Sequence, residues 1–120
     1  MRQLWHPELD QVSLARVLTA LGDPVRLAII RTLADGEEHT RSDFDSNELA
    51  QSTLSHHVKM LREAGLTRTR WESVRCFLSL RPEFEDRFPG LLTAILDQAA
   101  DPPAGPPVSA SRPPLPRPVR

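Results

Sequence analysis

The chain has 120 residues and a formal net charge of −1, and this length fits one folded domain rather than two. It has no run of about 18 apolar residues, and residues 1–10 lack the basic and apolar segments of a signal peptide, so we expect a cytoplasmic protein without a membrane span. The single cysteine, Cys76, excludes an internal disulfide and a cysteine-rich metal site.

The first part of the chain has the periodicity of helices. Residues 7–21 carry one apolar stripe at helical spacing, formed by Leu14, Val17, Leu18 and Leu21. Asp23 before Pro24 is typical of a helix start, so we expect a second helix over residues 24–34, ending before Gly36. Capping residues at Thr40 and Asp43 favour a short helix over residues 40–46.

A further helix, over residues 50–64, has two very different faces. Its apolar face is formed by Ala50, Leu54, Val58 and Leu61, and Gly65 follows where a helix commonly ends. Its polar face carries Ser52, His56 and Lys59, with Gln51, Ser55 and Arg62 at the margins. Hydroxyl, imidazole and ammonium groups on one exposed face suit contacts with base edges and phosphates.

Charge is segregated around this helix. Residues 35–48 are acidic, with Asp35, Glu37, Glu38, Asp43, Asp45 and Glu48 against Arg41. Residues 50–75 are basic, with Lys59, Arg62, Arg68, Arg70 and Arg75 against Glu63 and Glu72. A local basic segment is typical of nucleic-acid binding even in a near-neutral chain, although a solvated charged face would look the same on charge alone.

The remainder of the chain predicts a small hairpin, a last helix and a tail. Two antiparallel strands are expected over residues 67–71 and 75–80, with a turn near Glu72 and Ser73. Pro89 suits the first position of a helix ending near Ala100. Prolines recur through residues 101–120, so we expect a folded domain over residues 1–100 and a disordered, proline-rich tail over residues 101–120.

The first and last helices together carry more apolar surface than a domain of this size readily buries. The predicted dimerisation residues are Leu14, Leu18, Leu21, Leu91, Leu92, Ile95 and Leu96. A two-fold homodimer explains both stripes. The alternative is that both pack only on the core of their own domain.

Two segments, LGDPVRLAIIRTL and STLSHHVKMLREAGL, resemble the ArsR/SmtB family of winged-helix repressors. The resemblance covers about residues 14–80 and continues through the hairpin. It implies a mainly α winged helix-turn-helix fold with five helices and a two-stranded wing. It also implies a homodimer through the first and last helices, with the fourth helix in the major groove of DNA and the wing beside it.

The resemblance, with the polar face described above, gives a set of predicted DNA contacts. They are Gln51, Ser52, Thr53, Ser55, His56, Lys59 and Arg62 on the helix, and Arg68, Arg70 and Arg75 on the wing. His57 lies close to the apolar stripe, so we expect it to pack or to contact a phosphate rather than to read a base.

The metal sites of the family's best-known members are not present in this sequence. The third-helix region, EHTRSDFDSNELA, has no Cys-x-Cys, and the last helix, PGLLTAILDQAA, has Asp97 but no histidine. Weak candidate ligands for nickel or zinc remain at His6 with Glu8 and Asp10, and at His39 with Asp43 and Asp45. Isolated surface residues are the simpler interpretation, so we expect no metal cofactor.

The sequence therefore predicts a DNA-binding transcriptional regulator that acts as a homodimer on an inverted-repeat operator, with a metal- or stress-responsive circuit as one setting. If the circuit responds to a metal, we expect detection to lie elsewhere, for example in an accessory sensor protein that engages the tail. The alternative is a protein-interaction module that uses the winged fold and the tail without a DNA target. We do not expect an enzyme, because Ser55, His56 and His57 are the sole candidate cluster and adjacent helical residues point about 100° apart.

Overall fold

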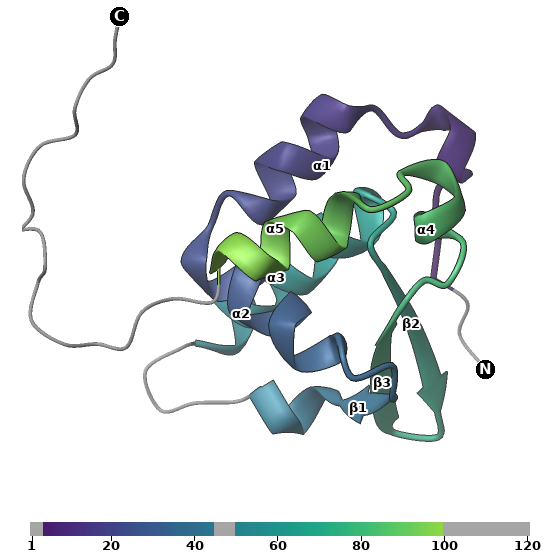
Figure 1. Cartoon of the computed structure of the whole chain (residues 1–120). Helices are drawn as coiled ribbons and strands as arrows, with labels where there is room; N and C mark the ends of the chain where they lie inside the picture. The colour runs from purple at the N-terminus through teal and green to yellow at the C-terminus, as the bar shows by residue number, and fades with distance from the viewer. Residues whose placement is uncertain (1–3, 45–49, 100–120) are drawn as a thin grey trace, which may run out of the picture.

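A computed structural model describes residues 4–44 and 50–99 of the chain. Figure 1 shows helices gathered beside a small sheet, which confirms the mainly α fold with a wing. In chain order the elements are the 3-10 helix η1 (Leu9–Gln11), α1 (Leu14–Leu21), α2 (Pro24–Leu33), β1 (His39–Thr40), the 3-10 helix η2 (Arg41–Phe44), α3 (Gln51–Glu63), β2 (Thr67–Glu72), β3 (Arg75–Leu80), α4 (Phe84–Arg87) and α5 (Leu91–Ala99).

The core lies where α1, α2, α3 and the sheet meet. Its fully buried side chains come from each of these elements and include Val17, Ile30, Leu33, Leu54, Leu61 and Leu78. Burial of each such side chain contributes about 1.5–3 kcal/mol to folding. The apolar face of α3 is therefore packed against protein, and its opposite face is left to solvent.

The first helix is shorter than the sequence predicted. Residues 7–13 form η1 and extended backbone, and α1 begins only after Ser13, whose side-chain oxygen accepts the Arg16 backbone N–H at 3.1 Å. The prediction of a helix from residue 7 is wrong because this cap competes with continuation of the helix toward the N-terminus. The start of α2 is as predicted, with Asp23 Oδ2 accepting the N–H groups of Val25 at 2.8 Å and Arg26 at 3.1 Å.

The sheet has three strands in the order β1-β3-β2, where the sequence predicted two. Strand β1 pairs antiparallel with β3, with His39 opposite Leu78 and Thr40 opposite Phe77. The predicted helix over residues 40–46 is present only as the 3-10 helix η2, and residues 45–46 lie outside the described residues. A two-residue strand has no sequence period of its own, so only its pairing with β3 reveals it.

The C-terminal part also differs from the prediction. Helix α4 was not predicted; it is one turn long and is held by Phe84, whose ring centroid lies 5.1 Å from that of Phe88. Helix α5 begins at Leu91 rather than Pro89, because Gly90 adopts a positive φ of 75° that interrupts the helix. Among the described residues, no helix is long and apolar enough to cross a membrane. The predicted tail, residues 101–120, lies outside the described residues, as does residue 100.

Candidate nucleic-acid interface

Helix α3 exposes one polar face over its whole length. The side chains of Gln51, Ser52, Thr53, Ser55, His56 and Lys59 are all exposed, while Leu54, His57, Val58 and Leu61 are buried on the other side. The helix is one residue shorter at each end than predicted, because Ala50 and Ala64 are its caps, and Ala50 is exposed rather than part of the apolar face. Gly65 follows the C-cap with a φ of 79°, as the sequence predicted. Six of the seven predicted contact residues of this helix are therefore accessible to a ligand.

Arg26 fixes α3 against the two preceding helices. Its Nη1 donates to His57 Nδ1 at 3.1 Å, and its Nε donates to the Ala20 carbonyl oxygen at 2.7 Å. His57 is only 8% exposed, so of its two predicted roles, packing or phosphate contact, the burial supports packing. Because arginine has only donors, Nδ1 is the acceptor in this bond. This link orients α3 on the end of α1 and the start of α2.

Arg41 lies beside the polar face of α3, a placement the sequence analysis missed. Its Nη2 donates to Ser55 Oγ at 2.7 Å, to the Gln51 carbonyl oxygen at 3.2 Å and to Gln51 Oε1 at 3.3 Å. Arg41 is the one basic residue of an acidic segment, so composition gave no reason to select it. Its position next to α3 depends on β1, which the sequence did not predict, and on the 3-10 form of η2, which was predicted as a longer helix.

An open groove of about 550 Å³ lies between η2, the start of α3 and the wing. Its lining consists of Thr40, Arg41, Ser42, Gln51, Ser55, Trp71, Val74, Arg75 and Cys76. Two guanidinium groups and several hydroxyls thus face the same hollow. Such a set of donors suits a phosphate group.

Arg75, at the tip of the wing, is exposed and lies opposite Glu72 in the strand register. Its guanidinium is 5.2 Å from the centroid of the Phe77 ring. Within residues 4–44 and 50–99, no carboxylate forms an ion pair with Arg75. Its charge is therefore available to an anion.

The other two wing arginines already have carboxylate partners. Arg68 Nη2 lies 3.2 Å from Glu83 Oε2, and Arg70 forms two bonds with Glu38, at 2.6 Å and 2.8 Å. The Arg70 hydrogen bond holds the pKa of the Glu38 carboxyl below its ordinary range. Both arginines would have to exchange a protein carboxylate for a phosphate in order to contact DNA.

Arg62, predicted as a DNA contact, is half-buried. Its Nε donates to the Trp5 carbonyl oxygen at 3.0 Å, so it ties the N-terminal segment to the end of α3. Lys59 Nζ lies 3.8 Å from Oε2 of Glu63, one helical turn further along, and an ion pair at such an exposed position is weak. Lys59 thus keeps a largely solvated charge on the polar face.

His6 is used to fix the N-terminal segment. Its Nδ1 lies 2.9 Å from the Leu4 carbonyl oxygen, and its Nε2 accepts the Thr69 backbone N–H at 3.1 Å. Burial lowers the pKa of His6, and the nearby positive charges of Arg62, Arg81 and Arg68 lower it further. With both ring nitrogens in use, His6 does not assemble with Glu8 and Asp10 into a metal site.

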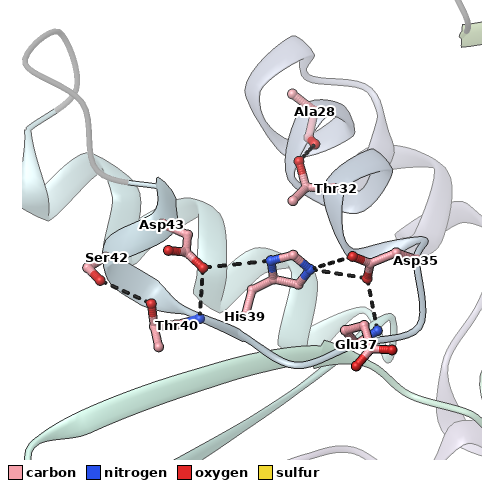
Figure 2. Close-up of polar contacts among 8 residues, drawn as sticks. All are labelled: Ala28, Thr32, Asp35, Glu37, His39, Thr40, Ser42 and Asp43. Atoms are coloured by element: carbon pink, nitrogen blue, oxygen red, sulfur yellow. Dashed lines mark hydrogen bonds and ion pairs between the residues drawn. The ribbon is translucent and has the colours of Figure 1, made fainter.

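His39 lies between two carboxylates, as Figure 2 shows. Its Nε2 is 2.9 Å from Asp35 Oδ2, and its Nδ1 is 3.7 Å from Asp43 Oδ2. Asp43 Oδ2 also accepts the Thr40 backbone N–H at 3.3 Å, so the cluster holds η2 in place. Asp45, the third predicted ligand, lies outside the described residues. Across the described ranges no three His, Cys, Asp or Glu side chains are grouped to hold a metal ion.

The predicted dimerisation residues divide into two groups. Leu14 and Leu18 are 46% and 47% exposed on α1, whereas Leu21 is 6% exposed and belongs to the core. On α5, the predicted residues Leu91, Leu92, Ile95 and Leu96 are half-buried and pack partly on the core. Helix α5 has no buried residue although it is strongly apolar. An apolar surface therefore remains on α1 and α5.

Comparisons with known proteins agree with this geometry. Residues 21–70 match the family model described as a helix-turn-helix domain. The chain is 42% identical over 89 residues to the uncharacterised HTH-type transcriptional regulator YceK from Bacillus subtilis, an alignment that covers 72% of this chain and 88% of that protein. It is 35% identical over 88 residues to the biofilm growth-associated repressor of Agrobacterium fabrum, covering 73% of each.

Solved structures also show similarity to regulators with a helix-turn-helix. A homodimeric winged helix-turn-helix DNA-binding domain from Mycobacterium bovis, described as a possible ArsR-family transcriptional regulator, superposes with a TM-score of 0.58 at 28% identity, covering 78% of this chain and 84% of that one. The relatives are regulators of transcription, which confirms the expectation that the chain is not an enzyme. The chain belongs to the ArsR/SmtB family of winged helix-turn-helix transcriptional regulators.

Proposed function

We propose that this regulator reads a specific operator by inserting the exposed face of α3 into the major groove. The observation that carries the proposal is the continuous polar face of α3, opposite a face on which Leu54, Val58 and Leu61 are buried. The helix has 13 residues and is about 20 Å long at about 1.5 Å per residue. That length fits one major groove and presents three or four side chains to base edges.

The proposed contacts fall into two kinds. Base edges and nearby phosphates are contacted from α3 by Gln51, Ser52, Thr53, Ser55, His56 and Lys59. A backbone phosphate occupies the groove between α3 and the wing, bound by Arg75. Arg68 and Arg70 contribute less than Arg75, because their carboxylate partners must first be displaced. Arg62 acts mainly by holding the N-terminal segment.

The regulator is proposed to act in the cytoplasm as a homodimer through α1 and α5. Exposed Leu14 and Leu18 and the half-buried apolar face of α5 provide the surface for a second copy. The related domain from Mycobacterium bovis is described as homodimeric. Two copies related by a two-fold axis would bind an inverted repeat, with half-site centres about 34 Å apart.

Fluorescence anisotropy of the full chain tests the proposal. The duplex is one that the chain selects from a random library, and the control is a scrambled duplex of the same composition. We expect tighter binding to the selected duplex and an affinity that falls with salt, since phosphate contacts release counterions. Ser55→Ala or His56→Ala should reduce the selectivity by about 1–3 kcal/mol. Equal affinity for both duplexes would leave the protein-interaction module as the better account.

The signal that controls binding is proposed to act through a partner rather than through a metal held by His6 or His39. Both imidazoles already serve to fix local structure. The accessory sensor protein and its docking on residues 101–120 stay a prediction, supported by the prolines and by Arg112, Arg117 and Arg120. A chain lacking residues 101–120 that binds its operator and responds in cells as the full chain does would remove the tail from the mechanism.

A further inference from the structure

We propose that Arg41 determines which base α3 reads, by holding the Ser55 hydroxyl as a hydrogen-bond donor toward DNA. The proposal rests on the proposed function of α3 and assigns a role to a residue outside that helix. Arg41 is a positioning residue in this account, because it acts through Ser55. The observation is the bond of 2.7 Å from Arg41 Nη2 to Ser55 Oγ.

The direction of this bond is fixed by chemistry. A guanidinium has donors and no acceptor, so Ser55 Oγ must accept. The serine hydroxyl has one proton and two lone pairs, and one lone pair is now occupied by a charged donor. Polarisation by that donor makes the hydroxyl a stronger donor and a weaker acceptor for its next partner.

Arg41 also takes the carbonyl oxygen to which the Ser55 hydroxyl proton would ordinarily be donated. A serine inside a helix commonly donates to the carbonyl four residues earlier, which for Ser55 is the Gln51 carbonyl. Here the Gln51 carbonyl oxygen accepts from Arg41 Nη2 at 3.2 Å instead. In the described part of the chain, no protein acceptor takes the Ser55 hydroxyl proton. The proton is therefore directed to the exposed face of α3.

The backbone that carries Arg41 is held from two sides. Asp43 Oδ2 accepts the Thr40 N–H, and His39 links Asp43 to Asp35 after the end of α2, as Figure 2 shows. Pairing of Thr40 with Phe77 attaches the same segment to the sheet. A fixed backbone lets Arg41 hold Ser55 before DNA arrives.

The chemistry predicts the kind of base that Ser55 selects. A hydroxyl presented as a donor favours the major-groove acceptors, which are guanine O6 and N7, adenine N7 and thymine O4. It disfavours an edge that offers an amino group alone, as cytosine does. Selection against cytosine at the base facing Ser55 is therefore the expected signature.

The test measures base preference with the full chain and a duplex library randomised at each half-site position. Ser55→Ala identifies the position that Ser55 reads, where we expect the preference to fall about five-fold or more. Arg41→Met, which removes the donors and keeps the apolar stem, should reduce the preference at that same position to a similar degree. In the double variant R41M/S55A, the Arg41 change should have no further effect on that preference.

Two matched controls separate positioning from simple charge loss. Arg75→Met removes the guanidinium on the other wall of the groove, and it should weaken all sequences alike without changing the preference at the Ser55 position. Ser52→Ala removes a hydroxyl of α3 that Arg41 does not contact, so its effect should add to that of Arg41→Met. Thermal unfolding checks that each variant is folded, and Arg41→Leu, which also lacks a donor, replaces Arg41→Met if the latter does not fold.

The outcomes distinguish this inference from the proposed function. Wild-type protein without any sequence preference overturns both. Wild-type protein that binds selectively, together with an R41M variant that loses affinity equally for all sequences and keeps the wild-type preference, overturns the role of Arg41 alone. A loss of preference confined to the base position of Ser55 supports it.

Discussion

Arg26 gives the most quantitative prediction about how α3 is held in its reading position. The half-buried guanidinium bonds to the Ala20 carbonyl oxygen at 2.7 Å and to His57 Nδ1 at 3.1 Å. Hydrogen bonds that involve a charged group contribute about 1.5–3 kcal/mol each. Partial exposure reduces both, so we expect Arg26→Met to lower the free energy of unfolding by about 2–4 kcal/mol.

Urea unfolding followed by circular dichroism measures this loss. DNA affinity should also fall in conditions where R26M is still folded, because α3 loses its link to α1 and α2. Arg31→Met is the matched control on the same helix, since Arg31 is exposed and its side chain makes no hydrogen bond or ion pair to the described residues; it should change the free energy of unfolding by less than about 0.5 kcal/mol.

The role of His57 can be separated from that of Arg26. After Arg26→Met, His57 Nδ1 is buried without its donor, and an unsatisfied buried group costs about 1–3 kcal/mol. Adding His57→Leu removes that group, so R26M/H57L should be more stable than R26M. An R26M variant within about 0.5 kcal/mol of wild type would refute the reasoning, because the link would then carry no net stabilisation.

Three further predictions concern pH, assembly and DNA contacts. The pKa of His6 in the folded chain lies below its ordinary value of 6.5, so the unfolded chain binds a proton at His6 more readily than the folded chain does. The free energy of unfolding should therefore keep its full value above about pH 6.5 and fall as the pH drops toward the pKa of His6 in the folded chain. In His6→Asn, the free energy of unfolding should change less steeply with pH. Leu18→Glu should give a folded monomer in analytical ultracentrifugation if α1 forms the dimer, and a dimeric variant would contradict that interface. Arg75→Met should reduce the slope of log affinity against log salt by about 1. Arg68→Met should change that slope less, because the Arg68 guanidinium already pairs with Glu83. Equal effects of the two variants would contradict the proposal that Arg75 contributes more to DNA binding than Arg68.

Local signals allowed much of this fold to be predicted from the sequence. Asp23 and Gly65 mark the start of α2 and the end of α3 because capping depends on residues adjacent in the chain. The faces of α3 were predicted correctly within the helix, since helical periodicity decides them, whereas Ala50 is exposed because it lies before the first turn. Elements no longer than about one helical turn, such as β1 and α4, could not be predicted, because they form only through contacts with other parts of the chain.

The site was predicted in part, and the misses share one physical cause. Arg68 and Arg70 looked like available cations, but their partners Glu83 and Glu38 are 15 and 32 residues away in sequence. From the sequence, Arg41 is an isolated basic residue in an acidic segment, but η2 brings it to Ser55, 14 residues further along. Ion pairs and hydrogen bonds between distant segments decide which charges remain available, and no local pattern records them.

The face of α3 that the account assigns to DNA can be located directly by NMR. Backbone amide signals of the full chain would be followed during titration with the duplex it selects. The account predicts the largest shifts at residues 51–59 of α3 and at Arg75 of the wing, with smaller changes on α5. Shifts concentrated on α1 and α5, with α3 unchanged, would contradict it.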